Sequence, residues 1–407
     1  MIKRILKNSF SLLICNVLLR GTIFSINLIA ANLLPQNQYG QLSMFRQTAT
    51  LLEGFISGAF GTIEIKEIST KKNNKTISSI IALNVFLLLV LFCFIFYFSS
   101  SLVEKISFPF SPLVLSLLLF IFITSIRFTS LSLNIYLGLE NFIEIFKVCV
   151  ISCFLCMPLA FYISNNFGLI GCLISTVITY FICSIFYIIS LFRKKYLVFD
   201  DIISFKYKLL IKQVGIVFLS ILCSSWTLWY MRVLVSRTNN GLVEIANFDI
   251  VFQFLTVIMM VTGATTSVLI PRLADSSESK TKNIFINFLI NYVVIILFAL
   301  LIYLLGDELL SLSGESYMTK DNHDMLVLIM IGALFFTSSS IMNKISISKD
   351  CFWIVFISSV ISSIYSLSYL LYNGTYDAQS LVMGYINFYM ISFLTYLLLV
   401  SFVKYKK

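Results

Sequence analysis

The sequence is poor in the residues that soluble enzymes use. Only 12% of its 407 residues are charged, and His323 is the single histidine. The chain contains neither an H-E-x-x-H zinc motif nor the G-x-x-x-x-G-K-[ST] loop that cradles nucleotide phosphates. No carboxylate pair or nucleophile–base pair falls in a stretch long enough to be a folded domain outside the apolar runs. We therefore expect no enzyme, no metal site, no cofactor and no ATP-driven step in this chain.

What the sequence has in abundance is apolar residues. The hydrophobic fraction is 59% and the mean hydropathy is +0.95. Apolar runs long enough to cross a bilayer, about 20 residues each, recur from one end to the other. A β-barrel would instead show alternating segments of about 10 residues. The nine cysteines mostly lie inside these runs, where small apolar packing residues are expected.

We predict an all-α, polytopic membrane protein with about twelve transmembrane helices. The expected spans are 10–33, 41–63, 78–102, 112–138, 146–164, 168–192, 213–235, 245–269, 284–305, 325–343, 351–371 and 379–401. The sequence of Phe128–Ser132 recurs approximately in Phe336–Ser340, six spans later. Six is an even number, so two halves with the same orientation and pseudo-two-fold symmetry are expected. The predicted parts are an N-terminal six-helix bundle (1–192), a cytoplasmic amphipathic linker (193–212) and a C-terminal six-helix bundle (213–407).

The distribution of positive charge predicts the orientation. With the N-terminus inside, the cytoplasmic segments hold 22 lysines and arginines and the external loops hold 3. This bias places both termini in the cytoplasm. It also accounts for the net charge of +10 without a nucleic-acid partner.

Six ionisable residues fall inside the predicted spans. They are Arg20, Arg46, Glu53, Arg127, Arg232 and Asp249. Charges at membrane depth are costly and normally face a protein interior or a wet cavity. Paired or snorkelling structural charges are one interpretation. It is favoured for Arg232, whereas for Asp249 the two interpretations have equal weight. A hydrated cavity between the two bundles is the other, and it is favoured for the deeper arginines.

The balance of these charges suggests a ligand. Four guanidiniums face two carboxylates, and arginine binds phosphate through two parallel hydrogen bonds. Arg46 and Glu53 are seven residues apart, so they share one face of their helix. As hypotheses, Arg20, Arg46, Arg127 and Arg232 bind a diphosphate or its glycan. Glu53 and Asp249 are then the candidates for coupling to an ion.

Three short segments carry a resemblance to a known family. They are Asn32–Gly40, Gly58–Lys66 with Glu64, and Leu269–Ala274. With two six-helix halves and a length near 400 residues, the chain resembles the polysaccharide flippases of the multidrug/oligosaccharidyl-lipid/polysaccharide exporter superfamily. Its likeness is strongest to bacterial O-antigen flippases (Wzx), and the resemblance implies a MATE-like fold.

The resemblance also implies a function. The substrate would be an O-antigen repeat unit on undecaprenyl diphosphate, turned from the cytoplasmic to the periplasmic leaflet of the bacterial inner membrane by alternating access. A proton or sodium gradient would drive it, and the polymerase and chain-length regulator of the same lipopolysaccharide pathway would be partners beside the membrane lipids. Two alternatives stay open, namely a cation-coupled small-molecule exporter and a membrane-embedded oligosaccharide polymerase or acyltransferase.

Overall fold

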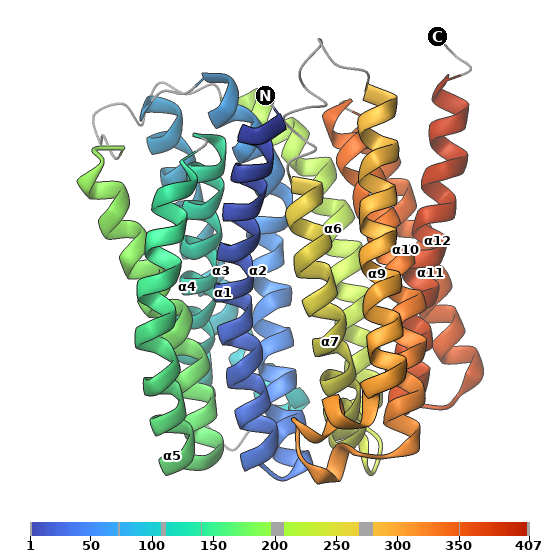
Figure 1. Ribbon diagram of the computed structural model, residues 1–407. Coiled ribbons are helices and arrows are strands. Elements are labelled where there is room, and N and C mark those ends of the chain that lie inside the picture. Colours follow the sequence, from blue (N-terminus) through green and yellow to red (C-terminus); the bar gives the residue numbers. More distant parts are fainter. Residues whose placement is uncertain are drawn as a thin grey trace. The chain divides into compact units, whose positions relative to one another are not determined.

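The computed structural model describes residues 2–71, 74–106, 111–139, 141–196, 207–267, 280–349 and 351–404, and within them it is helical (Figure 1). The helices are α1 (Ile2–Leu33), α2 (Gln36–Lys71), α3 (Asn74–Ile106), α4 (Pro112–Gly138), α5 (Phe142–Arg193), α6 (Tyr207–Ser236), α7 (Gly241–Ser267), α9 (Lys280–Ser311), the short 3-10 helix η2 (Glu315–Tyr317), α10 (Lys320–Ser348), α11 (Phe352–Asn373) and α12 (Ala378–Lys404). Each predicted span overlaps one of these helices. The predicted linker at 193–212 lies mostly outside the described residues, and its last residues begin α6.

Local sequence explains where several helices begin and end. Pro35 lies two residues after the end of α1 and cannot continue the hydrogen-bonding ladder of that helix. Ser111 caps α4, whose first residue is Pro112, and Thr319 caps α10. Gly374 ends α11 in the left-handed conformation, with φ of 65°.

Helix α5 contains two of the predicted spans. Gly168 has φ of 54° and interrupts the helical backbone. Residues before the break contact residues after it, and residues farther before Gly168 contact residues farther after it. The Ser164 and Ser175 hydroxyls lie 3.1 Å apart, and Cys156 Sγ is 3.8 Å from the Thr179 carbonyl oxygen. The two segments therefore run antiparallel, as the predicted spans 146–164 and 168–192 require.

The described residues include nine helices long and apolar enough to cross a membrane. Large apolar side chains such as Phe86, Tyr303 and Ile364 stay exposed on them. Exposed apolar surface of this extent suits a lipid environment rather than water. The chain is a multi-pass membrane protein.

The residues divide into two compact units. The first unit contains Met1–Ser9, Asn27–Ser43 and Cys223–Lys407, and the second contains Phe10–Ile26 and Met44–Leu222. In the first unit, α10 packs on α7, α9 and α12, and α12 packs on α11. In the second, α4 packs on α5 and α3. The division passes through α1 and α2, so residues 27–43 group with the C-terminal half of the chain.

Candidate functional site

Arg20, Arg46 and Glu53 come together in the second unit, around Tyr180. Arg20 lies on α1, Arg46 and Glu53 on α2, and Tyr180 on the second segment of α5. The Tyr180 hydroxyl interacts electrostatically with all three charged side chains. This agrees with the seven-residue spacing, which places Arg46 and Glu53 on one face of α2. We call these four residues the Arg20 cluster.

The side chains of the Arg20 cluster differ in exposure. Arg46 and Glu53 are buried, whereas Arg20 is exposed and Tyr180 is half-buried. Two guanidiniums and one carboxylate leave the cluster with an excess of positive charge. An accessible guanidinium beside a buried one is suited to bind an anion that reaches the cluster from outside.

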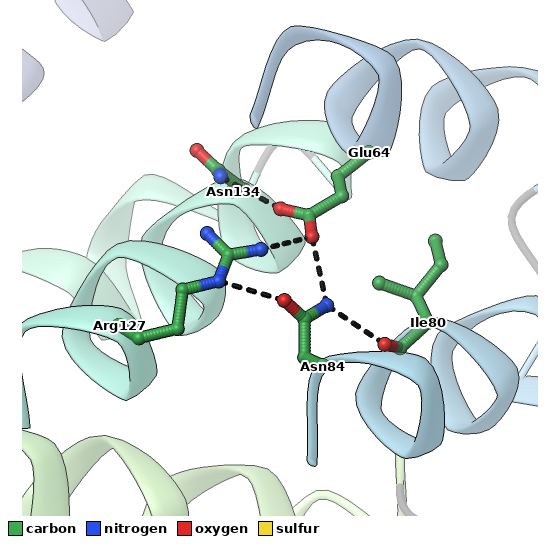
Figure 2. Close-up of polar contacts among 5 residues, drawn as sticks. All are labelled: Glu64, Ile80, Asn84, Arg127 and Asn134. Atoms are coloured by element: carbon green, nitrogen blue, oxygen red, sulfur yellow. Dashed lines mark hydrogen bonds and ion pairs between the residues drawn. The ribbon is translucent and has the colours of Figure 1, made fainter. Parts of the chain in front are cut away.

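Arg127 is in a different environment, which Figure 2 shows. Its side chain is fully buried and forms an ion pair with Glu64 through Nη2. Its Nε donates to Asn84 Oδ1 at 2.7 Å. Asn84 Nδ2 in turn donates to Glu64 Oε1 at 2.9 Å and to the Ile80 carbonyl oxygen at 2.8 Å. Asn134 Nδ2 donates to the other Glu64 oxygen at 2.9 Å. We call this set the Arg127 network.

Glu64 is the residue that sequence reasoning missed. The expected span ended at residue 63, whereas α2 continues to Lys71 and carries Glu64 into contact with α3 and α4. The count of four arginines against two carboxylates within the spans therefore lacked one member, because Glu64 is a third buried carboxylate beside Glu53 and Asp249. The sequence does contain a signal, since the seven-residue spacing of Arg127 and Asn134 places them on one face of α4, and both bind Glu64.

Arg232 lies in the first unit and is enclosed by aromatic rings. Its guanidinium carbon is 4.8 Å from the centre of the Phe248 ring, 5.1 Å from that of Phe252 and 5.4 Å from that of Tyr385. Its Nε donates to the Tyr385 hydroxyl at 2.9 Å. The side chain is 1% exposed, and neither Nη1 nor Nη2 has a hydrogen-bond partner among the described residues. We call this arrangement the Arg232 box.

Asp249 lies on α7 between Phe248 and Phe252, two rings of the Arg232 box, and is also buried. Its Oδ2 accepts from the Tyr39 hydroxyl at 3.0 Å and from Gln253 Nε2 at 3.3 Å. Gln253 Nε2 also contacts the Tyr39 hydroxyl. Asp249 and Gln253 thus share the helix face that their four-residue spacing predicts.

The six candidate residues therefore fall into separate environments. Arg20, Arg46 and Glu53 form one cluster, and Arg127 is bound to Glu64 in the same unit. Arg232 and Asp249 belong to the other unit. Their convergence on a single cavity stays a prediction.

No protein-family model and no curated protein sequence matches the chain. Solved structures do match. A MATE transporter from Vibrio cholerae has a TM-score of 0.72 at 13% sequence identity, covering 100% of this chain and 97% of that one. An outward-facing multidrug resistance MATE transporter also has a TM-score of 0.72, at 14% identity, covering 98% and 96%. This chain has the MATE transporter fold.

A third similar structure is a transporter of the MOP superfamily from Pyrococcus furiosus. Its TM-score is 0.70 at 14% identity, covering 98% of this chain and 96% of that one. Its binding pocket is described as having reverse polarity, which suggests a different function for that transporter. The MATE fold confirms the predicted all-α architecture. At these identities the likeness concerns the fold, so substrate and coupling have to be argued from residues.

Proposed function

We propose that the chain is a flippase that moves a lipid-linked oligosaccharide from the cytoplasmic to the periplasmic leaflet of the bacterial inner membrane by alternating access. Its substrate is an O-antigen-like repeat unit on undecaprenyl diphosphate. Both termini lie in the cytoplasm, in agreement with the bias of lysine and arginine. The MATE fold supports the transport mechanism, because the similar structures are transporters of this kind.

The Arg20 cluster is the observation that carries the proposal. It combines an exposed arginine with a buried one and contains a single carboxylate. A diphosphate offers several oxygens to which two guanidiniums can donate at once. A cationic drug would instead be repelled by the excess positive charge. Glu53 within the cluster, and Asp249 in the other unit, are the groups that we propose for coupling to a proton or sodium gradient.

The roles of the other arginines follow from their surroundings. Arg127 is fully buried and its charge is matched by Glu64, so its part in substrate binding requires this ion pair to open. Arg232 has free donors but 1% exposure, so it also needs a rearrangement before a substrate reaches it. We therefore place the first contact with the diphosphate at Arg20 and Arg46.

A reconstitution experiment tests this function. The purified protein is placed in vesicles that contain an undecaprenyl diphosphate-linked oligosaccharide, and a glycosidase outside reports which lipids reach the outer leaflet. Arg46→Gln should slow the transfer about 10- to 100-fold, because hydrogen bonds between charged groups contribute about 1.5–3 kcal/mol each. Arg237→Gln, at an exposed position between α6 and α7, is the matched control and should leave the rate unchanged.

Two results would reject the proposal. One is a wild-type protein that fails to move the lipid under any imposed ion gradient. The other is an Arg46→Gln variant that transfers it at the wild-type rate. The second candidate, a cation-coupled small-molecule exporter, is favoured by the multidrug transporters among the similar structures. It predicts export of a cationic dye from the same vesicles, which the flippase should not perform.

A further inference from the structure

Residues 27–43, at the junction of α1 and α2, are held by the C-terminal part of the first unit. Asn32 Nδ2 donates to the Leu312 carbonyl oxygen at 2.6 Å, just after the end of α9. Gln36 Nε2 donates to the Ser316 carbonyl oxygen in η2 at 3.1 Å. These contacts join residues separated by 280 positions in the chain. We call residues 27–43 the docked segment.

Gly40 shows how closely the docked segment approaches α7. A Cβ atom at this position would lie 2.0 Å from the Leu242 carbonyl oxygen, which is backbone and cannot turn aside. Tyr39, next to Gly40, is completely buried and meets the ring of Tyr317 edge-on at 6.3 Å between centroids. The docked position thus depends on a glycine and places Tyr39 inside the unit.

The buried hydroxyl of Tyr39 forms a hydrogen bond with the carboxylate of Asp249. It donates to Asp249 Oδ2 at 3.0 Å, and Gln253 Nε2 donates to the same oxygen. Asp249 is 3% exposed, so water does not replace these donors readily. If the docked segment moved away, a buried carboxylate would lose a hydrogen bond and become markedly less stable.

The candidate for a replacement donor is Arg232, whose guanidinium lies over Phe248, the residue before Asp249. The Arg232 box has two guanidinium nitrogens, Nη1 and Nη2, with no hydrogen-bond partner among the described residues. The Tyr385 hydroxyl accepts from Arg232 Nε at 2.9 Å, and the Tyr385 ring packs against Phe248 and Phe252, which lie on either side of Asp249 along α7. Phe248, one of the rings of the box, directly precedes Asp249 on α7.

We propose that Asp249 exchanges partners between two conformations. With the segment docked, the carboxylate is held by Tyr39 and the Arg232 guanidinium rests among aromatic rings. When the segment leaves, the carboxylate pairs with Nη1 and Nη2 of Arg232. Tyr39 and Arg232 are then positioning residues that supply hydrogen bonds to Asp249, one in each state. The importance of this exchange for coupling rests on the proposed function, whereas the exchange itself can be observed without any substrate.

Cross-linking measures the docked fraction directly. Gln36→Cys and Ser316→Cys place two thiols at a contact of the docked segment, on either side of a protease site inserted between Tyr196 and Tyr207. A short bifunctional maleimide then joins the two protein fragments only in molecules with the segment docked. The same protein without Ser316→Cys shows the background from native cysteines.

In the two-cysteine protein with the protease site, Tyr39→Phe should lower the ratio of docked to undocked molecules about 10- to 100-fold. This is the effect of losing one hydrogen bond to a charged group. Tyr317→Phe is the matched control, because its contact with Tyr39 is through the ring, which phenylalanine keeps. Adding Arg232→Gln to Tyr39→Phe should restore cross-linking, since the undocked state then lacks the positive charge and the reach of the guanidinium. Adding Arg232→Lys, which keeps the charge, should not restore it.

Asp249→Asn tests whether the effect of Tyr39→Phe depends on the charge of Asp249 or only on the packing of the docked segment. In that background Tyr39→Phe should have little further effect, because the charge it serves is gone. Gly40→Ala should abolish docking in either background, since its clash does not involve Asp249. The proposal is overturned if Tyr39→Phe leaves cross-linking unchanged, or if Arg232→Gln and Tyr39→Phe shift it in the same direction. These readouts do not depend on transport, so a failed flippase assay would leave them valid.

Discussion

Arg127 and Arg232 are both almost completely buried, yet the protein surrounds them differently. Arg127 is bound by a carboxylate and an asparagine from two neighbouring helices (Figure 2). Arg232 has three aromatic rings and one tyrosine hydroxyl around it, with no carboxylate within ion-pair distance among the described residues. The first arrangement neutralises the charge, whereas the second only accommodates it against ring faces.

This difference suggests different roles. The Arg127 network joins α2, α3 and α4 through Glu64, Asn84 and Asn134, so opening it would leave a buried charge unpaired. The Arg232 box keeps two donors available at low exposure. A buried arginine whose charge is matched by a carboxylate is suited to hold helices together, as at Arg127, although its Nη1 has no hydrogen-bond partner among the described residues. One that is enclosed but incompletely bonded is suited to accept a new partner.

Breaking the Arg127 network should have the largest effect. Arg127→Met leaves Glu64 as an unpaired buried carboxylate, and we expect the free energy of unfolding to fall by about 3–5 kcal/mol. Chemical denaturation of the purified protein in detergent measures this. The double variant Arg127→Met with Glu64→Leu removes both charges and should recover most of the loss. A single variant as stable as the double would show that the ion pair is not what holds these helices.

Removing the charge from the Arg232 box should have a smaller effect. Arg232→Met gives up a cation–π interaction of about 0.5–2 kcal/mol. It also removes a buried charge that has no carboxylate partner among the described residues, and the two effects oppose each other. We expect a net change within about 1 kcal/mol by the same denaturation measurement. A loss as large as that of Arg127→Met would mean that the two arginines are equivalent after all.

An ion pair with an exposed lysine should have the smallest effect on stability of the three. Lys147 Nζ lies 3.4 Å from Glu144 Oε1 and is 60% exposed, and Lys194 Nζ lies 3.5 Å from the same oxygen. Exposed pairs contribute little, and here a second lysine remains after Lys147→Ala. We expect a change below about 0.5 kcal/mol. A cost comparable to that of the buried pair would indicate that Glu144 is far less accessible to water than its position suggests.

Helical periodicity was a good guide to pairs on one helix and a poor guide to partners on another. The spacing of Arg46 from Glu53 predicted two side chains on one face, and both act on Tyr180. The same geometry accounts for the contact of Gln253 with Asp249 and for the shared partner of Arg127 and Asn134. By contrast, Glu64 and Asn84 were not expected beside Arg127. Tyr39 was not expected beside Asp249, because these two residues are 210 positions apart.

The sequence alone determined that this is a helical membrane protein and where its spans lie, because a bilayer demands about 20 apolar residues for each crossing whatever the helices later pack against. Of the six charged residues that it placed in those spans, five are buried, whereas Arg20 is exposed and the buried Glu64 was missed. Tertiary structure alone decided what each charge meets, bringing Glu64 to Arg127 and Tyr39 to Asp249. Partners of this kind depend on which helices become neighbours and in which rotation, and a hydropathy pattern does not contain that information.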